Sequence, residues 1–477
     1  MSFHPAVKPL MQPVRPAMVL HHLGQLALIL AVLFSVPLAF AAATFDWELA
    51  RRILLAAVLP ALALGAFALI RPNDRPLQAN EALVITALTF IIAAALMTYP
   101  LTAEGLSPLD AWFESVSGVT TTGLSLVPSP ELHSDAFLFT RAWMQWFGGL
   151  GIVVLSLALA FGRSEDMRRL ADAGADEDSL PQGTRIHARR AFTIYVLLTV
   201  AGLILVLPTD LSPFEAVIHT LAAISTGGFG SVSDSLAGFG RSAQFALFGV
   251  SLLGALPLFL YYRVWRSGPV VLLLDPELRA LIVAVALVTG LLWWLGGLSP
   301  ADALLQAGSA QTTTGFSTLD SSELNPAAKG VLILSMATGG AAGSTAGGIK
   351  LLRLLILIRM IQLAVMRVQL PRHAVVQPAI AGRTLDGLQI EHALVLILLF
   401  LLLVLGSWMA FLVAGYPALD ALFEVVSATA TVGLSAGVTS PDLEPWLKLL
   451  LSLNMLAGRL EIIALLVLLF PGTWYKP

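Results

Sequence analysis

Apolar segments of about 20 residues recur along almost the whole chain and alternate with shorter polar connections. A segment of about 20 residues is long enough to cross a bilayer as a helix. The pattern therefore predicts an all-α polytopic membrane protein with about ten spans. These spans are expected near residues 20–42, 52–70, 80–98, 135–161, 191–207, 242–262, 278–297, 327–366, 392–414 and 447–470, of which the eighth is broken.

Four shorter apolar segments of another kind lie between the spans. The first opens with Ser107-Pro108-Leu109-Asp110, a helix-capping pattern, and predicts a helix of about two to three turns, too short to cross a membrane. Two further copies repeat the cap, whereas the fourth lacks the serine. Each ends in a stretch of small residues: Thr121-Thr122-Gly123, Thr226-Gly227-Gly228, Thr313-Thr314-Gly315 and Thr431-Val432-Gly433.

The four segments indicate four copies of one module. Successive final glycines are 105, 87 and 118 residues apart, and an acid followed by alanine lies 13 residues before each: Asp110, Glu215, Asp302 and Asp420. The predicted organisation is a two-helix leader followed by four span–loop–span repeats. Their bounds are 1–75 for the leader and 76–165, 166–270, 271–385 and 386–477 for the repeats.

The small-residue stretches are the candidate cation site. Irregular backbone at membrane depth is tolerated where it lines a cavity, and carbonyl oxygens arranged around one axis can replace the water of an ion. The twelve residues are therefore predicted to form a filter that binds potassium. The four acids are expected mainly to cap helices, with attraction of cations as the alternative. Glu114 is expected in an outer cation funnel or at the headgroups, and His219 as a hydrogen-bonded interior group.

The interrupted span contains five glycines among residues 339–348. Glycine is a poor helix former, so we expect an unwound segment that lines or blocks the ion path, with close helix packing as the alternative. Arg459, predicted in mid-span, either faces this segment or pairs with Glu461 or a helix end. The candidate gate residues are Gly339, Gly340, Gly343, Gly347, Gly348, Lys350 and Arg459.

Charge and composition narrow the function. Charged residues make up 12% of the chain and the net charge is −3, which gives no indication of nucleic-acid binding. No arrangement of catalytic residues or ATP-binding motif is found, so an enzyme or a primary pump is not expected. Six arginines in 162–190 and six basic residues in 350–390 predict cytoplasmic linkers and outward-facing filters.

The repeated filter, the glycine stretch that ends at Lys350 and the Gln145–Gly151 segment (QWFGGLG) resemble the Trk/Ktr/HKT superfamily of potassium transporters. Together with the two leading spans and the NMLAGRLE segment around Arg459, they are most similar to the TrkH subunits of bacterial Trk systems. The resemblance covers nearly the whole chain beyond about residue 17.

The resemblance implies potassium uptake across the bacterial inner membrane, with no covalent cofactor. It also implies a homodimer and cytoplasmic TrkA-type regulatory subunits that bind NAD or ATP. In plant relatives a serine at the first filter glycine is associated with sodium, whereas this chain has Gly123. A sodium or weakly selective monovalent cation pathway remains the alternative, since no copy has the full TVGYG sequence.

Overall fold

The computed structural model describes residues 13–69, 77–163, 180–369, 371 and 377–475. The regular secondary structure of these residues is helical, apart from one short antiparallel pair of strands, β1 (Ala379–Ile380) and β2 (Arg383–Thr384). The all-helical class predicted from the sequence is thus confirmed.

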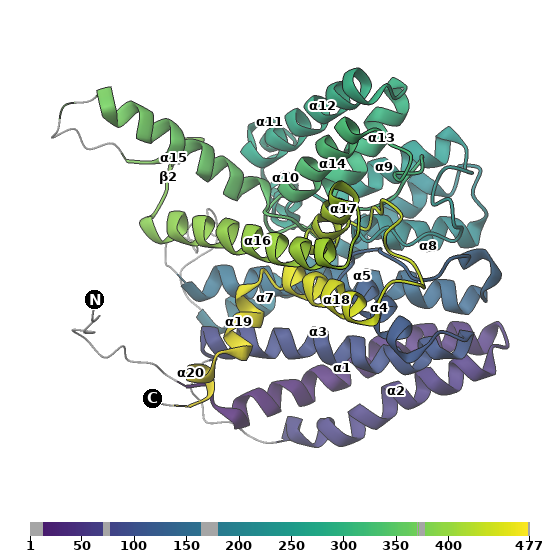
Figure 1. The fold of residues 1–477 in the computed structure, drawn as a ribbon. Helices are drawn as coiled ribbons and strands as arrows, with labels where there is room; N and C mark the ends of the chain where they lie inside the picture. Colours follow the sequence, from purple (N-terminus) through teal and green to yellow (C-terminus); the bar gives the residue numbers. More distant parts are fainter. Residues whose placement is uncertain (1–12, 70–76, 164–179, 370, 372–376, 476–477) are drawn as a thin grey trace.

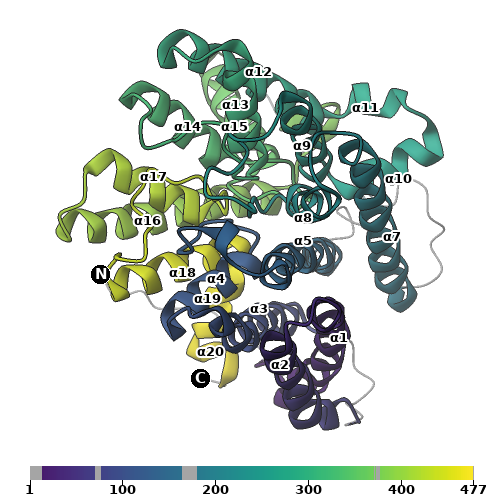
Figure 2. The same cartoon turned by 90° about the vertical axis from the view of Figure 1, so that its right-hand side faces the viewer.

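The chain begins with two long helices outside the repeats. These are α1 (Pro16–Ala43) and α2 (Trp47–Gly65), with a 3₁₀ turn η1 (Ala66–Leu69) after α2. The Asp46 side chain accepts a hydrogen bond from the Leu49 amide at 3.1 Å and so caps α2. Figures 1 and 2 place the pair at one edge of the molecule beside α3.

Four units of long helix, short helix and return helix follow. In each unit the short helix enters the bundle from one end and stops within it, and we call it the pore helix. The units are α3 (Ala79–Leu101), α4 (Pro108–Val119) and α5 (Asp135–Arg163); α7 (Leu180–Val206), α8 (Pro213–Ile224), α9 (Arg241–Gly254) and α10 (Leu258–Ser267); α12 (Pro276–Gly296), α13 (Pro300–Thr312), α14 (Pro326–Thr338) and α15 (Leu351–Gln369); and α16 (Gly387–Val413), α17 (Ala418–Thr429), α18 (Pro445–Arg459) and α19 (Ile463–Leu469).

Shorter elements connect these helices. They are η2 (Thr102–Glu104), η3 (Pro130–Leu132), α11 (Val270–Leu274) and α20 (Pro471–Trp474).

The starts of the pore helices follow from local sequence. Ser107, Ser212 and Ser299 each accept a hydrogen bond at 3.2 Å from the amide three residues later, and a proline occupies the first turn. The fourth pore helix, α17, begins after Pro417 without a side-chain cap. The missing serine noted in the sequence therefore has a direct structural counterpart.

Six helices among the described residues are long and apolar enough to cross a membrane, or up to eight spans if each bent pair counts as one. The bent pairs change the form of two expected spans. The span expected at 242–262 bends by 86° between α9 and α10, where Pro257 lacks an amide proton and disfavours helix at the residue before it. The span expected at 447–470 bends by 111° between α18 and α19.

The outer surfaces of the long helices are apolar. In α12, Ile282, Leu287 and Trp294 are exposed, and in α16 Leu398 and Leu402 are exposed. Exposed apolar surface of this extent marks a face that contacts lipid or another protein. The buried polar residues are instead concentrated around the ends of the pore helices, inside the bundle.

Candidate functional site: a ring of four filter stretches

The four small-residue stretches share one backbone conformation. The first threonine of each is left-handed, with φ between 51° and 56°, and the final glycine also has a positive φ, between 72° and 96°. A β-branched residue is strained in the left-handed region, so surrounding contacts must hold it there. The threonines are Thr121, Thr226, Thr313 and Thr431, and the glycines are Gly123, Gly228, Gly315 and Gly433.

Contacts between the stretches close a ring. A Cβ atom added to Gly123 would overlap the Gly227 carbonyl oxygen of the next repeat, and one added to Gly228 would overlap that of Thr314. The same holds for Gly315 against Val432 and for Gly433 against Thr122. Each filter glycine therefore lies against the carbonyl of the residue that precedes the filter glycine of the next repeat. The contacts run from the first repeat through the second, third and fourth and back to the first. All twelve predicted filter residues lie in this ring.

A buried polar side chain supports the outer part of each stretch. It projects from the pore helix nine residues before the glycine, and it is Glu114, His219, Gln306 or Glu424. Each bonds a serine just after its glycine: Glu114 Oε1 accepts from Ser125 at 2.6 Å, His219 Nε2 lies 3.2 Å from Ser231 Oγ, Gln306 Nε2 donates to Ser317 at 2.8 Å, and Glu424 Oε1 accepts from Ser435 at 2.9 Å. Three different residue types thus occupy one structural position, with glutamate in the first and fourth repeats.

Glu114 lies neither in an outer funnel nor at the headgroups, so both expectations for it are wrong. The side chain is buried and accepts from the Leu126 amide at 2.6 Å and from Arg141 Nε at 3.2 Å. The Arg141 guanidinium is also buried and lies 4.0 Å from the centre of the Phe229 ring, which follows the second filter glycine. The expectation for His219 as an interior hydrogen-bonded group is confirmed.

The acids at the pore-helix starts do more than cap helices. Asp110 accepts from Lys448 at 2.6 Å, Asp302 from Arg241 at 2.6 Å and Asp420 from Lys329 at 2.7 Å. Each cation comes from the return helix of the preceding repeat around the ring. Glu215 instead accepts from its own Ser212 amide at 3.0 Å. Three of the four junctions between neighbouring repeats are therefore joined by ion pairs. Neither helix capping nor attraction of transported cations, the two expected roles of these acids, included such pairs.

Glycines let the return helices approach the inner ends of the pore helices. A Cβ atom on Gly148, Gly254 or Gly458 would overlap the carbonyl four residues before the filter glycine of its own repeat. In the third repeat α14 ends at Thr338, and Gln311 Nε2 donates to the Gly339 carbonyl at 2.6 Å. The glycine-rich segment therefore begins close to the position at which α9 ends at Gly254 and α18 ends at Arg459, whereas α5 continues.

The glycine-rich loop, residues 339–350, lies against the inner side of the ring. The Gly347 amide donates to Thr313 Oγ1 at 2.7 Å, and Thr345 Oγ1 lies 3.3 Å from Thr226 Oγ1. A Cβ atom on Gly347 would overlap the Ala430 carbonyl and the Thr431 hydroxyl. The loop thus contacts the first residues of three filter stretches.

The other loop glycines have different surroundings. Gly339 and Gly348 have positive φ and lie against each other at the two ends of the loop, whereas Gly340 packs on Ala346 and Ala255. Gly343 also has a positive φ, with open space where a Cβ atom would be.

Arg459 is the last residue of α18, at the bend within the span expected at 447–470. It is buried, and it donates to the Thr345 carbonyl at 2.6 Å and to the Gly148 carbonyl at 3.2 Å. Its expected alternative partner, Glu461, instead accepts from Arg353 at 2.6 Å and lies 3.9 Å from Lys350 Nζ. Arg459 therefore joins the loop to the return helix of the first repeat.

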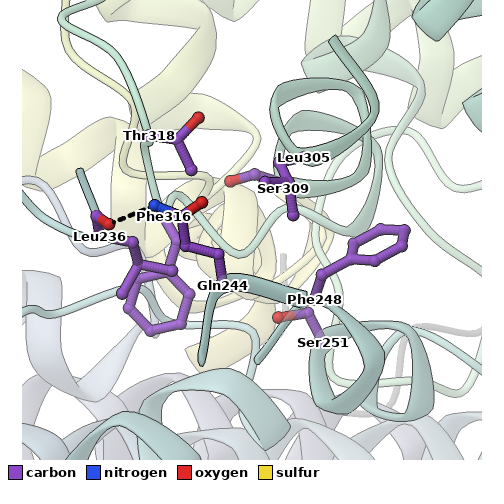
Figure 3. Close-up of a pocket in the computed structure, with 8 residues that line it drawn as sticks. All are labelled: Leu236, Gln244, Phe248, Ser251, Leu305, Ser309, Phe316 and Thr318. Carbon is purple, nitrogen blue, oxygen red and sulfur yellow. Dashed lines mark hydrogen bonds between the residues drawn. The ribbon is translucent and has the colours of Figure 1, made fainter. Parts of the chain in front are cut away.

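A small pocket lies behind the third filter stretch, between α9 and α13 (Figure 3). Ser117 and Ser427 accept hydrogen bonds at 3.1 Å from the amides of Gly123 and Gly433, six residues later. Ser309 has the same spacing from Gly315, but its hydroxyl lines the pocket and has no hydrogen-bond partner among the described residues. The ring is thus only approximately fourfold in its side chains.

No group of three or more His, Cys, Asp or Glu side chains that could hold a metal ion occurs in the part of the chain that the structure describes. The oxygens gathered in the ring of four stretches are backbone carbonyls and threonine hydroxyls. Such oxygens suit a hard monovalent cation that gives up its water.

Comparison with known proteins decides the family. The model of the TrkH family, described as a cation transport protein, matches residues 53–295 and 297–471. The chain belongs to the TrkH family of cation transport proteins. It is 32% identical to the Trk system potassium uptake protein TrkH of Escherichia coli K12 over 451 residues, which cover 87% of this chain and 90% of that protein.

Two further relatives cover almost the full length. The Trk system potassium uptake protein TrkI of Halomonas elongata is 30% identical over 483 residues, 96% of this chain and 97% of that protein. The crystal structure of the potassium transporter TrkH from Vibrio parahaemolyticus matches with a TM-score of 0.84 at 25% identity, covering 97% and 100% of the two chains. The chain is therefore a multi-span Trk-family cation transporter rather than an enzyme.

We expect the Arg141–Glu114 pair to contribute strongly to stability. Replacing Arg141 with Met leaves a buried carboxylate without its cation, which costs roughly 3–5 kcal/mol of unfolding free energy. The Tm of the purified protein in detergent should fall clearly. Adding Glu114→Gln should recover much of the loss, and Arg241→Met, which breaks a pair with a half-exposed arginine, should have a small effect. Equal losses in Arg141→Met and Arg241→Met would contradict this assignment.

Proposed function

We propose that this protein conducts potassium into the cell through the ring of filter stretches. The observation that carries the proposal is the closed sequence of glycine-to-carbonyl contacts around four repeats. A ring of this kind supplies oxygen ligands from all sides and provides the geometry by which carbonyls replace ion hydration. The similarity to potassium uptake proteins supports the same ion.

The proposed setting is the bacterial inner membrane, with the filter opening outward. Three of the pore-helix acids and their paired cations lie at the outer end in this orientation. Among the described residues, Arg353 and Arg359 of α15 lie beyond the glycine-rich loop, at the proposed cytoplasmic end. Basic residues at that end agree with the positive-inside rule.

The filter glycines should control selectivity. A serine at Gly123, Gly228, Gly315 or Gly433 requires a side chain at positive φ and overlaps a neighbouring carbonyl, so the oxygen ring must distort. We expect rubidium uptake by proteoliposomes to fall relative to sodium uptake. Gly415→Ser is the matched control, because Gly415 has φ of 91° but open space around the added Cβ atom.

Unchanged rubidium-to-sodium ratios in all four filter variants would refute the filter assignment. A wild-type protein that carries sodium as well as rubidium would instead favour the second candidate, a weakly selective monovalent cation pathway. That candidate is kept because the residue before the filter glycine differs among the repeats: Thr122, Gly227, Thr314 and Val432.

The glycine-rich loop is proposed as the gate. It lies against three of the four filter stretches, and Arg459 ties it to the first repeat, so the loop bridges the path below the filter. The buried hydrogen bond from Arg459 to Thr345 satisfies a carbonyl that the missing helix leaves open. Movement of the loop would break the hydrogen bond between the Arg459 guanidinium and the Thr345 carbonyl.

Replacing Arg459 with Ala should favour the open state. A hydrogen bond to a charged group contributes about 1.5–3 kcal/mol, so its loss can shift the closed-to-open ratio by about tenfold or more. Rubidium flux per inserted protein should rise, with an unchanged rubidium-to-sodium ratio. Arg359→Ala, which removes a hydrogen bond to Gln362 on the same helix, is the control. Flat or reduced flux per folded protein would favour a packing role for the loop.

We further propose a homodimer regulated by cytoplasmic nucleotide-binding subunits, a proposal that rests on the family resemblance. Residues 164–179 of the linker 162–190, with Arg168 and Arg169, lie outside the described residues. Affinity purification from native membranes should recover a soluble protein that binds NAD or ATP. Purification that retains transport activity but recovers no such protein would count against this regulation.

A further inference from the structure

The second filter stretch lacks a side chain where the others have one. Thr122 and Thr314, which precede their filter glycines, each place a hydroxyl 2.8 Å from that of the threonine two residues earlier. The fourth stretch has Val432 at this position. The second has Gly227 followed by Gly228, the pair with the greatest backbone freedom in the ring.

Gln145, from α5 of the first repeat, occupies the vacant space. Its carboxamide is buried, donates to the Gly227 carbonyl at 2.5 Å and accepts from the Phe229 amide at 3.1 Å. A Cβ atom added to Gly227 would lie 2.5–2.8 Å from the Cδ, Oε1 and Nε2 atoms of Gln145. One side chain from a different repeat therefore fills the volume of the missing side chain and holds the peptides on both sides of Gly228.

We propose that Gln145 is a positioning residue that sets the cation selectivity of the second filter stretch. The inference rests on the proposed function of the ring. The Gly227 carbonyl lies against Gly123, so its orientation affects the junction between the first and second repeats. Selectivity in a carbonyl filter depends on the number and placement of the oxygens, and a rotated Gly227 peptide changes both.

The close fit of Gln145 to Gly227 provides a reciprocal test. Gln145→Ala removes both hydrogen bonds and opens space, whereas Gly227→Ser introduces a side chain into space that Gln145 already fills. In the double variant the new serine has room, and Ser225 lies two residues upstream, the spacing of Thr120 and Thr122. Gly227 is not at positive φ, so the backbone accepts the serine.

The measurements are rubidium and sodium uptake by proteoliposomes, each normalised to folded protein, together with Tm. Gln145→Ala should lower the rubidium-to-sodium ratio about tenfold, because it removes the two buried hydrogen bonds that hold the second filter stretch. Gly227→Ser should lower it as well, and the double variant should recover most of the ratio. Gln244→Ala is the matched control, because this buried glutamine donates to the Leu236 carbonyl at 2.8 Å, outside the filter stretches.

The outcomes separate this inference from the proposed function. A wild-type protein that does not discriminate rubidium from sodium would overturn the proposed filter itself. If the wild type is selective, two results for Gln145→Ala would overturn only the role of Gln145. One is an unchanged rubidium-to-sodium ratio, and the other is an equal fall of both fluxes together with a fall in Tm. Single variants that match the double variant would likewise overturn the claim that the two positions compensate.

Discussion

The structure depends on the contact between each filter glycine and the carbonyl that precedes the next glycine. This contact occurs four times and closes on itself, so no stretch can change position without displacing its neighbours. It requires the positive φ of each glycine and the left-handed threonine two residues before it. The pore helices, their caps and the return helices all serve to hold these few residues in place.

Support for the ring comes from buried polar groups rather than from apolar packing alone. The position nine residues before each glycine is occupied by Glu114, His219, Gln306 or Glu424, and each bonds the chain just beyond the filter. A buried polar group must be paired to avoid a large desolvation cost, so these pairs also specify one geometry. The position nine residues before the glycine accepts different residues because the serine just beyond the filter is the one hydrogen-bonding partner that all four share.

The approximate fourfold symmetry is broken in three repeats, and a separate role is proposed for each departure. In the third repeat the return helix gives way to the glycine-rich loop, which contacts filter threonines of the second and third repeats. In the fourth the chain reverses after Arg459, with Glu461 and Ile462 at positive φ. The reversal places Glu461 beside Arg353 while Arg459 faces the loop. The second repeat uses Gln145 in place of a side chain of its own.

The sequence by itself determined the helical membrane class, the four repeats, the capped pore helices and the interruption after Thr338. These features depend on local composition and spacing, which apolar periodicity, serine–proline caps and glycine runs reveal directly. Only the tertiary structure decided the partners of Glu114, Gln145 and Arg459, the ion pairs between repeats and the reversal at 460–462. Those contacts join residues far apart in the chain, such as Asp110 and Lys448, which are 338 positions apart, and no local pattern encodes such a pairing. The reversal likewise places a β-branched isoleucine at a φ that its own preference opposes, so contacts made elsewhere in the fold must hold it there.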